Sequence, residues 1–235
     1  MPLRRLTGRE RSERANWQLA ALLAFVAGTV DVSGYLDLHQ FTSHMSGIVA
    51  ALAADLAERG AGALIAPAMA LAAFIAGAAV CAVLINWSRR RNRESLYAVP
   101  VLLEALLLST LALPIMHAHF SLALLVLCFS MGLQNAIITK ISRAEIRTTH
   151  VTGMITDIGI ELGKACYRNR KRDVPPVRPD RERLFVLLRL VGLFFSGGVM
   201  GAFVYPRIGF LVMLPLAAGL AALTVLPIRA DMIGA

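Results

Sequence analysis

LIAPAMALAAFIAGAAVCAVLI, running from Leu64 to Ile85, is an unbroken apolar stretch without a charged side chain. A helix needs about 20 apolar residues to cross the ~30 Å hydrocarbon core of a bilayer, and this stretch is long enough. Backbone amides find no water inside a bilayer, so only a helix or a closed barrel satisfies them. The stretch therefore predicts a transmembrane helix.

The rest of the chain repeats this character. Hydrophobic residues make up 57% of the 235 residues and charged residues 17%, against ~45–50% and ~25% in soluble domains. We therefore predict an all-α, polytopic membrane helix bundle. Five further runs are nearly uncharged: Ala20–Val30, Ala98–Met116, Phe120–Ile141, Leu184–Tyr205 and Ile208–Leu226.

The net charge of +9 does not indicate a nucleic-acid partner. The basic residues cluster in the short gaps between apolar runs, where membrane topology already predicts them. The three cysteines form no CxxC pair and the chain has no HExxH motif, so neither a disulfide framework nor a zinc site is indicated. We expect no cofactor, no metal and no catalytic residues.

Two polar segments resemble each other. FTSHMSG (Phe41–Gly47) and RTTHVTG (Arg147–Gly153) share the pattern Thr-[Ser/Thr]-His-x-[Ser/Thr]-Gly, and each has a carboxylate, Asp55 or Glu161, eleven residues after its histidine. Apolar runs surround both segments in the same order. The chain thus contains the series apolar, polar, apolar, apolar twice.

This repetition sets the expected domain boundaries. We predict a first membrane repeat at 17-116 and a second at 117-228, the second containing a basic cytoplasmic loop at 164-183. A basic cytoplasmic tail at 1-16 precedes the repeats, and a short tail at 229-235 follows them.

The basic clusters decide the predicted topology. They lie in the N-terminal tail, at 89–93, at 140–147 and at 164–183. If neither polar segment crosses the bilayer, all four clusters lie on the cytoplasmic side, as the positive-inside rule requires. A helix from His44 to Ala57 would also span only ~21 Å, less than the hydrocarbon core. We therefore expect six full spans plus two short polar re-entrant or interfacial helices, with both termini in the cytoplasm.

Such a chain is a 3+3 inverted repeat, an architecture that many secondary transporters use.

Four elements carry a resemblance to a known family: Gly28–Asp31 (GTVD), the first polar motif, Gly132–Asn135 (GLQN) and Arg147–Gly163 (RTTHVTGMITDIGIELG). Together they resemble the YoaK family of bacterial multi-pass inner-membrane proteins. The resemblance covers most of the chain, and the last motif is long enough to be specific. It implies a membrane topology, with the bacterial inner (plasma) membrane as the expected location, and no particular substrate.

The polar motifs have the composition of helix starts. A hydroxyl residue precedes each histidine as a good N-cap, and a helix that starts within a membrane presents unpaired N–H groups and the positive end of its dipole. That arrangement suits an anion or a substrate carboxylate. The alternative is that the hydroxyls only cap the helices and the glycines only let another backbone approach. The candidate binding residues of the motifs are Thr42, His44, Ser46, Gly47, Thr148, His150, Thr152, Gly153 and Asp157.

Three further candidates lie within apolar runs. Asp31 and Asn135 hold matching places in the two halves, and Glu104 lies shortly after Pro100. A carboxylate inside a membrane is costly unless it is paired or protonated, and such residues often mark ion or proton paths. Packing ties between helices explain Asn135 equally well.

These features favour a small-solute or ion transporter or permease, with proton coupling as a further hypothesis, acting on a small-molecule or ion substrate within the lipid bilayer. A non-catalytic membrane scaffold or sensor is the alternative, with the basic loop as its contact surface. A membrane-embedded metal-dependent enzyme is the weakest hypothesis.

The topology predicts which loops an impermeant reagent reaches. In a variant whose three cysteines are replaced by serine, an R91C substitution should not react with an impermeant maleimide added outside the cell, and should react once the membrane is permeabilised. A matched A118C variant should react from outside in both cases. Reaction of R91C from outside would contradict the predicted topology.

Overall fold

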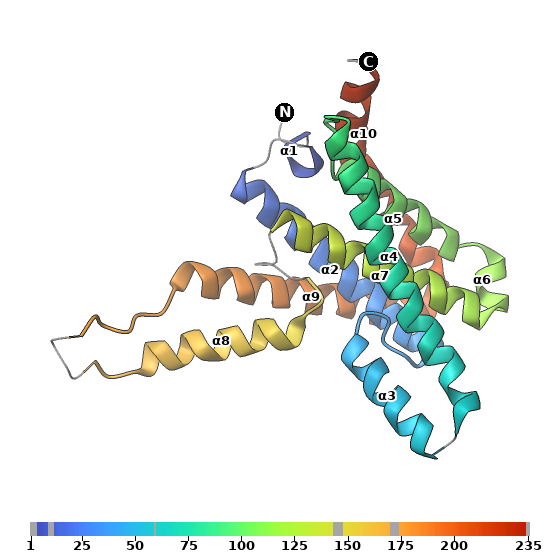
Figure 1. Cartoon of the computed structure of the whole chain (residues 1–235), viewed down its shortest axis with the longest axis horizontal. Coiled ribbons are helices and arrows are strands. Elements are labelled where there is room, and N and C mark those ends of the chain that lie inside the picture. The colour runs from blue at the N-terminus through green and yellow to red at the C-terminus, as the bar shows by residue number, and fades with distance from the viewer. Residues whose placement is uncertain (1–3, 9–11, 59, 143–147, 170–173, 234–235) are drawn as a thin grey trace.

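The computed structural model describes residues 4–8, 12–58, 60–142, 148–169 and 174–233, and every regular element within these ranges is helical (Figure 1). Arg147 of the second motif and parts of the basic tail and of the basic loop lie outside the described residues. The helices are α1 (Arg4–Thr7), α2 (Glu13–Leu38), α3 (Met45–Glu58), α4 (Ile65–Arg90), α5 (Ala98–Leu111), α6 (Pro114–Ala118), α7 (Phe120–Ile141), α8 (Val151–Cys166), α9 (Arg181–Ile208) and α10 (Met213–Ile233), with 3-10 turns η1 (Ala61–Leu64) and η2 (Gly209–Val212).

Four helical segments of the described chain are long and apolar enough to cross a membrane: Glu13–Leu38, Gly62–Arg90, Phe120–Ile141 and Arg181–Ile233. The last of these joins α9, η2 and α10. The apolar helix α5 is shorter. The prediction of an all-helical membrane protein is therefore confirmed.

Two predicted runs are not single helices. The run Ile208–Leu226 begins at the last residue of α9, passes through η2 and enters α10. The stretch Ala98–Met116 divides into α5, which ends at Leu111, and α6, which begins at Pro114. Leu113 has an extended backbone with ψ 140°, because the ring of a following proline disfavours the helical region. The full span expected here is thus a 14-residue helix followed by a short one.

The helices α2 and α9 pack so closely that only glycine fits between them. A Cβ placed on Gly28 of α2 would lie 1.9 Å from the carbonyl oxygen of Phe194 on α9, and one on Gly197 of α9 would lie 2.0 Å from that of Phe25 on α2. Thr29 adds a hydrogen bond to the Gly197 carbonyl across the same contact, at 3.0 Å. Small residues permit such backbone approach in membrane helix pairs.

A second pair, α4 and α7, has the same contact. A Cβ on Gly77 of α4 would lie 2.0 Å from the carbonyl oxygen of Phe129, and one on Gly132 of α7 would lie 1.9 Å from that of Phe74. Gly28 and Gly132 each stand three residues before the polar residues Asp31 and Asn135. Glycine therefore occupies both sides of each of these two helix contacts.

The remaining helices close the bundle at one end. α5 packs against α10 and α7. The Asp231 carboxylate near the end of α10 accepts hydrogen bonds from the backbone N–H groups of Glu94 and Ser95, at 2.7 and 3.1 Å. These bonds hold the C-terminal end of α10 against the connection between α4 and α5, near α1 (Figure 1).

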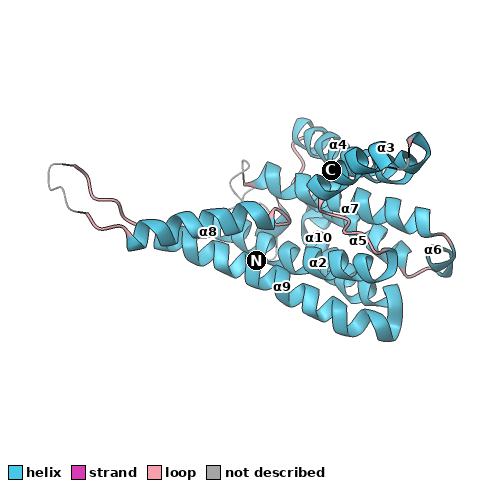
Figure 2. Cartoon of the chain, turned by 90° about the horizontal axis from the view of Figure 1, so that it is seen from below, coloured by secondary structure: helices cyan, strands magenta, loops and turns pink. Residues whose placement is uncertain are grey.

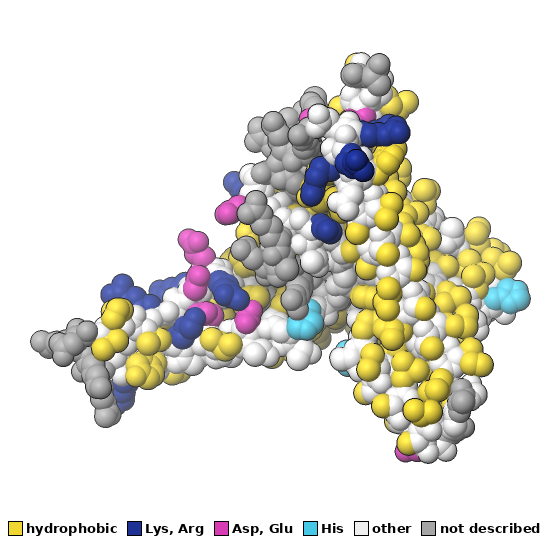
Figure 3. All heavy atoms as spheres, viewed as in Figure 1, with side chains coloured by type: hydrophobic (Ala, Val, Ile, Leu, Met, Phe, Trp, Pro, Cys, Tyr) yellow, Lys and Arg dark blue, Asp and Glu magenta, His cyan; other side chains and the backbone are white. Residues whose placement is uncertain are grey.

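The polar helices lie outside this bundle. α8 packs along the first half of α9, and the two project from the other helices as a hairpin in both views (Figures 1 and 2). α3 packs against α4 in another direction. The side chains on the surface differ between these parts. Hydrophobic side chains cover α4, while arginine and lysine side chains gather near the C-terminus and along the hairpin (Figure 3).

The glycine contacts predict that replacing glycine by alanine on α9 lowers the stability of the protein at one position and not at another. G197A should lower the stability of the detergent-solubilised protein by roughly 1–3 kcal/mol or more, since the added methyl group would overlap a backbone carbonyl. G192A lies on the same helix, where a Cβ meets no other atom within 4 Å, and should be neutral or slightly stabilising. Thermal unfolding measured side by side tests the difference, and equal stabilities of the two variants would contradict the packing.

Candidate functional site

The start of α3 is fixed by a carboxylate of α2. Asp31, only 5% exposed, accepts four hydrogen bonds from the first polar motif. The backbone N–H and hydroxyl of Thr42 donate to Oδ1, at 2.8 and 3.1 Å. The Ser43 N–H donates to Oδ1 and its hydroxyl to Oδ2, both at 2.9 Å. The negative charge thus lies against the amino end of α3, where the helix dipole favours it.

The start of α8 is held by the matching residue of α7. The hydroxyl of Thr149 donates to Oδ1 of Asn135 at 2.5 Å, and the Asn135 amide donates to the Met131 carbonyl at 2.9 Å. The neighbouring Thr148 is fully buried, and its hydroxyl has no partner in the part of the chain that the structure describes. In both halves, then, the polar residue near the end of an apolar helix bonds to the residue just before the motif histidine.

The nearest neighbours of the motif glycines are the motif histidines. No second backbone is among the nearest atoms at Gly47 or Gly153. A Cβ on Gly153 would instead meet Nδ1 of His150 at 2.2 Å, and one on Gly47 would meet Nδ1 of His44 at 2.9 Å. The repeated His-x-x-Gly is therefore a steric unit, in which each imidazole folds back over the first turn of the helix that follows it.

One pocket contains the second motif. It has a cavity volume of about 760 Å³ and lies between the start of α2, the first turns of α8 and the first turns of α9. Four predicted residues line it: His150, Thr152, Gly153 and Asp157. Its other lining residues are Glu13, Trp17, Met154, Thr156, Asp180, Glu182, Arg183, Val186, Leu187 and Leu190.

Sequence analysis missed the α9 side of this pocket. It assigned the residues up to 183 to a loop, whereas α9 already begins at Arg181 with Asp180 as its N-cap. The Asp180 side chain accepts a hydrogen bond from the Arg183 N–H at 3.0 Å. Asp180 stands four residues before Leu184, where the periodic apolar run begins. An aspartate in this place is a recognisable capping signal, and it could have placed this helix start.

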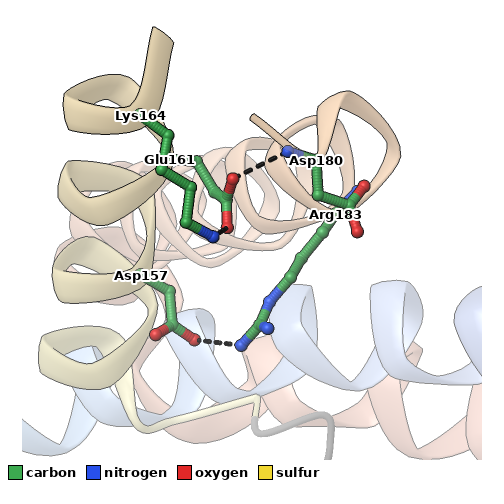
Figure 4. A network of polar contacts seen from close by, with 5 residues as sticks. All are labelled: Asp157, Glu161, Lys164, Asp180 and Arg183. Carbon is green, nitrogen blue, oxygen red and sulfur yellow. Dashed lines mark hydrogen bonds and ion pairs between the residues drawn. The ribbon is translucent and has the colours of Figure 1, made fainter. Parts of the chain in front are cut away.

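One ion pair and one hydrogen bond join α8 to the start of α9 beside the pocket (Figure 4). Arg183 donates to Asp157 at 2.9 Å. Glu161 accepts from Lys164 at 2.8 Å and from the Asp180 N–H at 2.8 Å. The hydrogen bond from Lys164, followed by that from the Asp180 N–H, lowers the pKa of Glu161 below its ordinary value against the opposing effect of burial.

The pocket combines two kinds of charge. The amino end of α8 and the imidazole of His150 lie on one side. The lining side chains include the carboxylates of Glu13, Asp157, Asp180 and Glu182 against one guanidinium, that of Arg183. A purely anionic ligand would meet repulsion from these carboxylates, so the expected preference for an anion applies only to the helix start itself.

The other predicted residues lie elsewhere. Thr42 is buried at the Asp31 contact, while His44 and Ser46 are exposed at the start of α3 and do not line this pocket. Glu104 is fully buried on α5. The pocket therefore brings together the second-motif candidates and leaves the first motif at a separate helix start.

The fold and these helix starts define a multi-pass transmembrane protein. Residues 19–226 match the family described as "Protein of unknown function (DUF1275)", and the chain belongs to this family. It is similar to the UPF0700 transmembrane protein YoaK of Bacillus subtilis (strain 168), with 26% identity over 159 residues, which cover 66% of this chain and 71% of that relative. The resemblance to the YoaK family is thereby confirmed. No solved structure matches the chain.

The lowered pKa of Glu161 predicts how the hairpin responds to acid. Its stabilising contacts are complete above the ordinary glutamate pKa and are lost as the pH falls through the lower pKa of the folded state. Hydrogen exchange of the α8 amides, corrected for intrinsic rates, should show protection that declines in this acid range. E161Q should remove that decline, and E182Q should keep it. The same pH dependence in wild type and E161Q would contradict the assignment.

Proposed function

We propose that this protein is an inner-membrane transporter of a small polar solute, built as two inverted repeats of three spans and one re-entrant helix each. The observation that carries the proposal is the pair of matched helix starts, one bonded to Asp31 and the other to Asn135, with a pocket of small-molecule size at the second.

The helix contacts support the repeat. If the two halves are exchanged, α2 takes the place of α7 and α4 takes that of α9. The contact of α2 with α9 then becomes the contact of α7 with α4, and both contacts have the same reciprocal glycine and phenylalanine positions. The same exchange turns α3 into α8, because α3 packs on α4 and α8 packs on α9.

Six spans follow from the apolar helices. The long segment Arg181–Ile233 turns at Gly209, where φ is 58°, so α9 and α10 count as two spans. Together with α2, α4, α7 and the pair α5–α6, which we count as one interrupted span over residues 98–118, they make six. With the basic clusters on the cytoplasmic side, α2, α5 and α9 run outward and α4, α7 and α10 run inward.

Helix length and position support re-entry of α3 and α8. α3 has 14 residues and α8 has 16, which correspond to ~21 and ~24 Å, less than the ~30 Å of the hydrocarbon core. Asp31 lies seven residues before the end of α2, and Asn135 six before the end of α7. Each polar helix therefore starts ~9–10 Å inside the end of a span. Starts of this kind hold substrates in other inverted-repeat carriers.

The pocket also suggests the class of solute. The amino end of α8 attracts a carboxylate, and Glu13 and Glu182 of the lining attract an ammonium group. A small zwitterion such as an amino acid satisfies both, whereas a simple anion satisfies only the first.

A scaffold or sensor is the second candidate, and the projecting α8–α9 hairpin favours it. Arg168, Arg178 and Arg181 are exposed there, and a basic surface beside the cytoplasmic leaflet attracts anionic lipid. A scaffold needs this surface but not the helix starts, so variants of the two features distinguish the functions.

Replacing the motif histidines should separate these functions. Uptake is measured by adding a panel of labelled amino acids and other small metabolites outside proteoliposomes. H150A and H44A should abolish the uptake that wild type shows, because both helix starts take part in the transport cycle. R178A, on the exposed hairpin, should transport at close to the wild-type rate. Wild-type uptake by both histidine variants at every pH would mean that the motifs only cap helices and that the site lies elsewhere.

A further inference from the structure

Glu104 is a buried acid that the pocket does not use. It lies on α5, six residues after Ala98, and its side chain is 0% exposed. Neither carboxylate oxygen has a hydrogen-bond partner among the residues that the structure describes. Apolar residues of the same helix, Val101, Ala105 and Leu108, are buried around it.

No hydrogen bond from the described residues of the neighbouring helices compensates this carboxyl group. On α4 the charged side chains, Arg89 and Arg90, are exposed in its last turn. α5 packs against α10, α7 and α4. On α4 the buried thiol of Cys81 lies within electrostatic reach of Glu104, and Lys140, exposed near the end of α7, acts on the same thiol. On α10 the ionisable side chains are Arg229, which is exposed, and Asp231, which is bonded to Ser95 and Glu94.

An ionised carboxylate is costly in such a place. Moving an isolated charge into an apolar interior costs many kcal/mol, and a group in that situation takes up a proton instead. The same holds for an acid within a membrane span, where unpaired carboxylates mark proton paths. A bound metal cation is a poor alternative, because hard cations need several oxygen ligands. Among the described residues, no group of three or more His, Cys, Asp and Glu side chains could hold one.

Asp31 provides the contrast. It is also buried within a long apolar helix, but its two oxygens accept four hydrogen bonds from the start of α3. Two buried acids of one bundle therefore have opposite surroundings, and only one of them lacks partners for a charge.

We propose that Glu104 is a proton-binding site, protonated in this conformation, which releases its proton toward the cytoplasm during the transport cycle. The direction follows from position, since six residues of helix rise place Glu104 only ~9 Å from the end of α5 that joins the basic Arg89–Arg93 segment. The role in a transport cycle rests on the proposed function, whereas the presence of an exchangeable proton does not.

Carbodiimide labelling tests the proton directly. Dicyclohexylcarbodiimide enters bilayers and reacts with protonated carboxyl groups, leaving a stable adduct that mass spectrometry locates. Wild-type protein in liposomes should be labelled at Glu104, and the labelling should fall as the pH of the medium rises. E104Q should lose the adduct, and Asp31 should stay unlabelled in both proteins.

Two results would overturn the proposal without reference to transport. Absence of the Glu104 adduct at every pH would show that the group is not protonated. Labelling that stays constant up to strongly alkaline pH would show a neutral structural acid that exchanges no proton. Both readouts use the wild-type protein, so they stand even if E104Q fails to fold.

A transport measurement then separates this proposal from the function on which it rests. E104Q should lose accumulation driven by a pH gradient and keep counterflow exchange of the same solute, because exchange needs no net proton movement. Loss of neither activity would overturn the coupling role. If Glu104 is labelled but wild type takes up no solute, the proton-binding site is supported and the proposed transport function is rejected.

Discussion

Two close backbone contacts between helices organise the described part of the bundle. Four glycines, Gly28, Gly77, Gly132 and Gly197, face carbonyl oxygens of a neighbouring helix at distances that no side chain allows. They bring α2 against α9 and α4 against α7, and so place Asp31 and Asn135 beside the polar motifs. In a lipid environment, where apolar surface gains little by leaving the solvent, such backbone proximity supplies much of the packing energy.

The two helix starts are alike in position and different in charge. Asp31 brings a carboxylate to the backbone N–H groups of Thr42 and Ser43, which occupies the amino end of α3. Asn135 offers only a neutral amide, whose oxygen accepts a hydrogen bond from the Thr149 hydroxyl. The amino end of α8 therefore keeps more of its positive potential for a ligand, and that is the end that borders the pocket.

Much of this arrangement could be predicted from sequence. The repeated motif, the matching positions of Asp31 and Asn135 and the membrane character follow from residue order and periodicity. The reason for the motif glycines could not be predicted, because it depends on the rotamer of the adjacent histidine. The pocket could not be predicted either, because it needs the α8–α9 hairpin. In that hairpin one ion pair joins Asp157 to Arg183 across a long connection. The helix break before Pro114 could have been predicted from the effect of proline on the preceding residue, but the sequence analysis did not predict it.

The central claim is that two halves of one chain face the membrane in opposite directions. An experimental structure in lipid nanodiscs tests it most directly, because the bilayer is then visible beside the protein. Superposition of residues 17–116 on 119–227 should require a two-fold axis lying in the membrane plane, with α3 entering from outside and α8 from the cytoplasm. A two-fold axis along the membrane normal would mean that both polar helices cross the bilayer, and it would contradict the account.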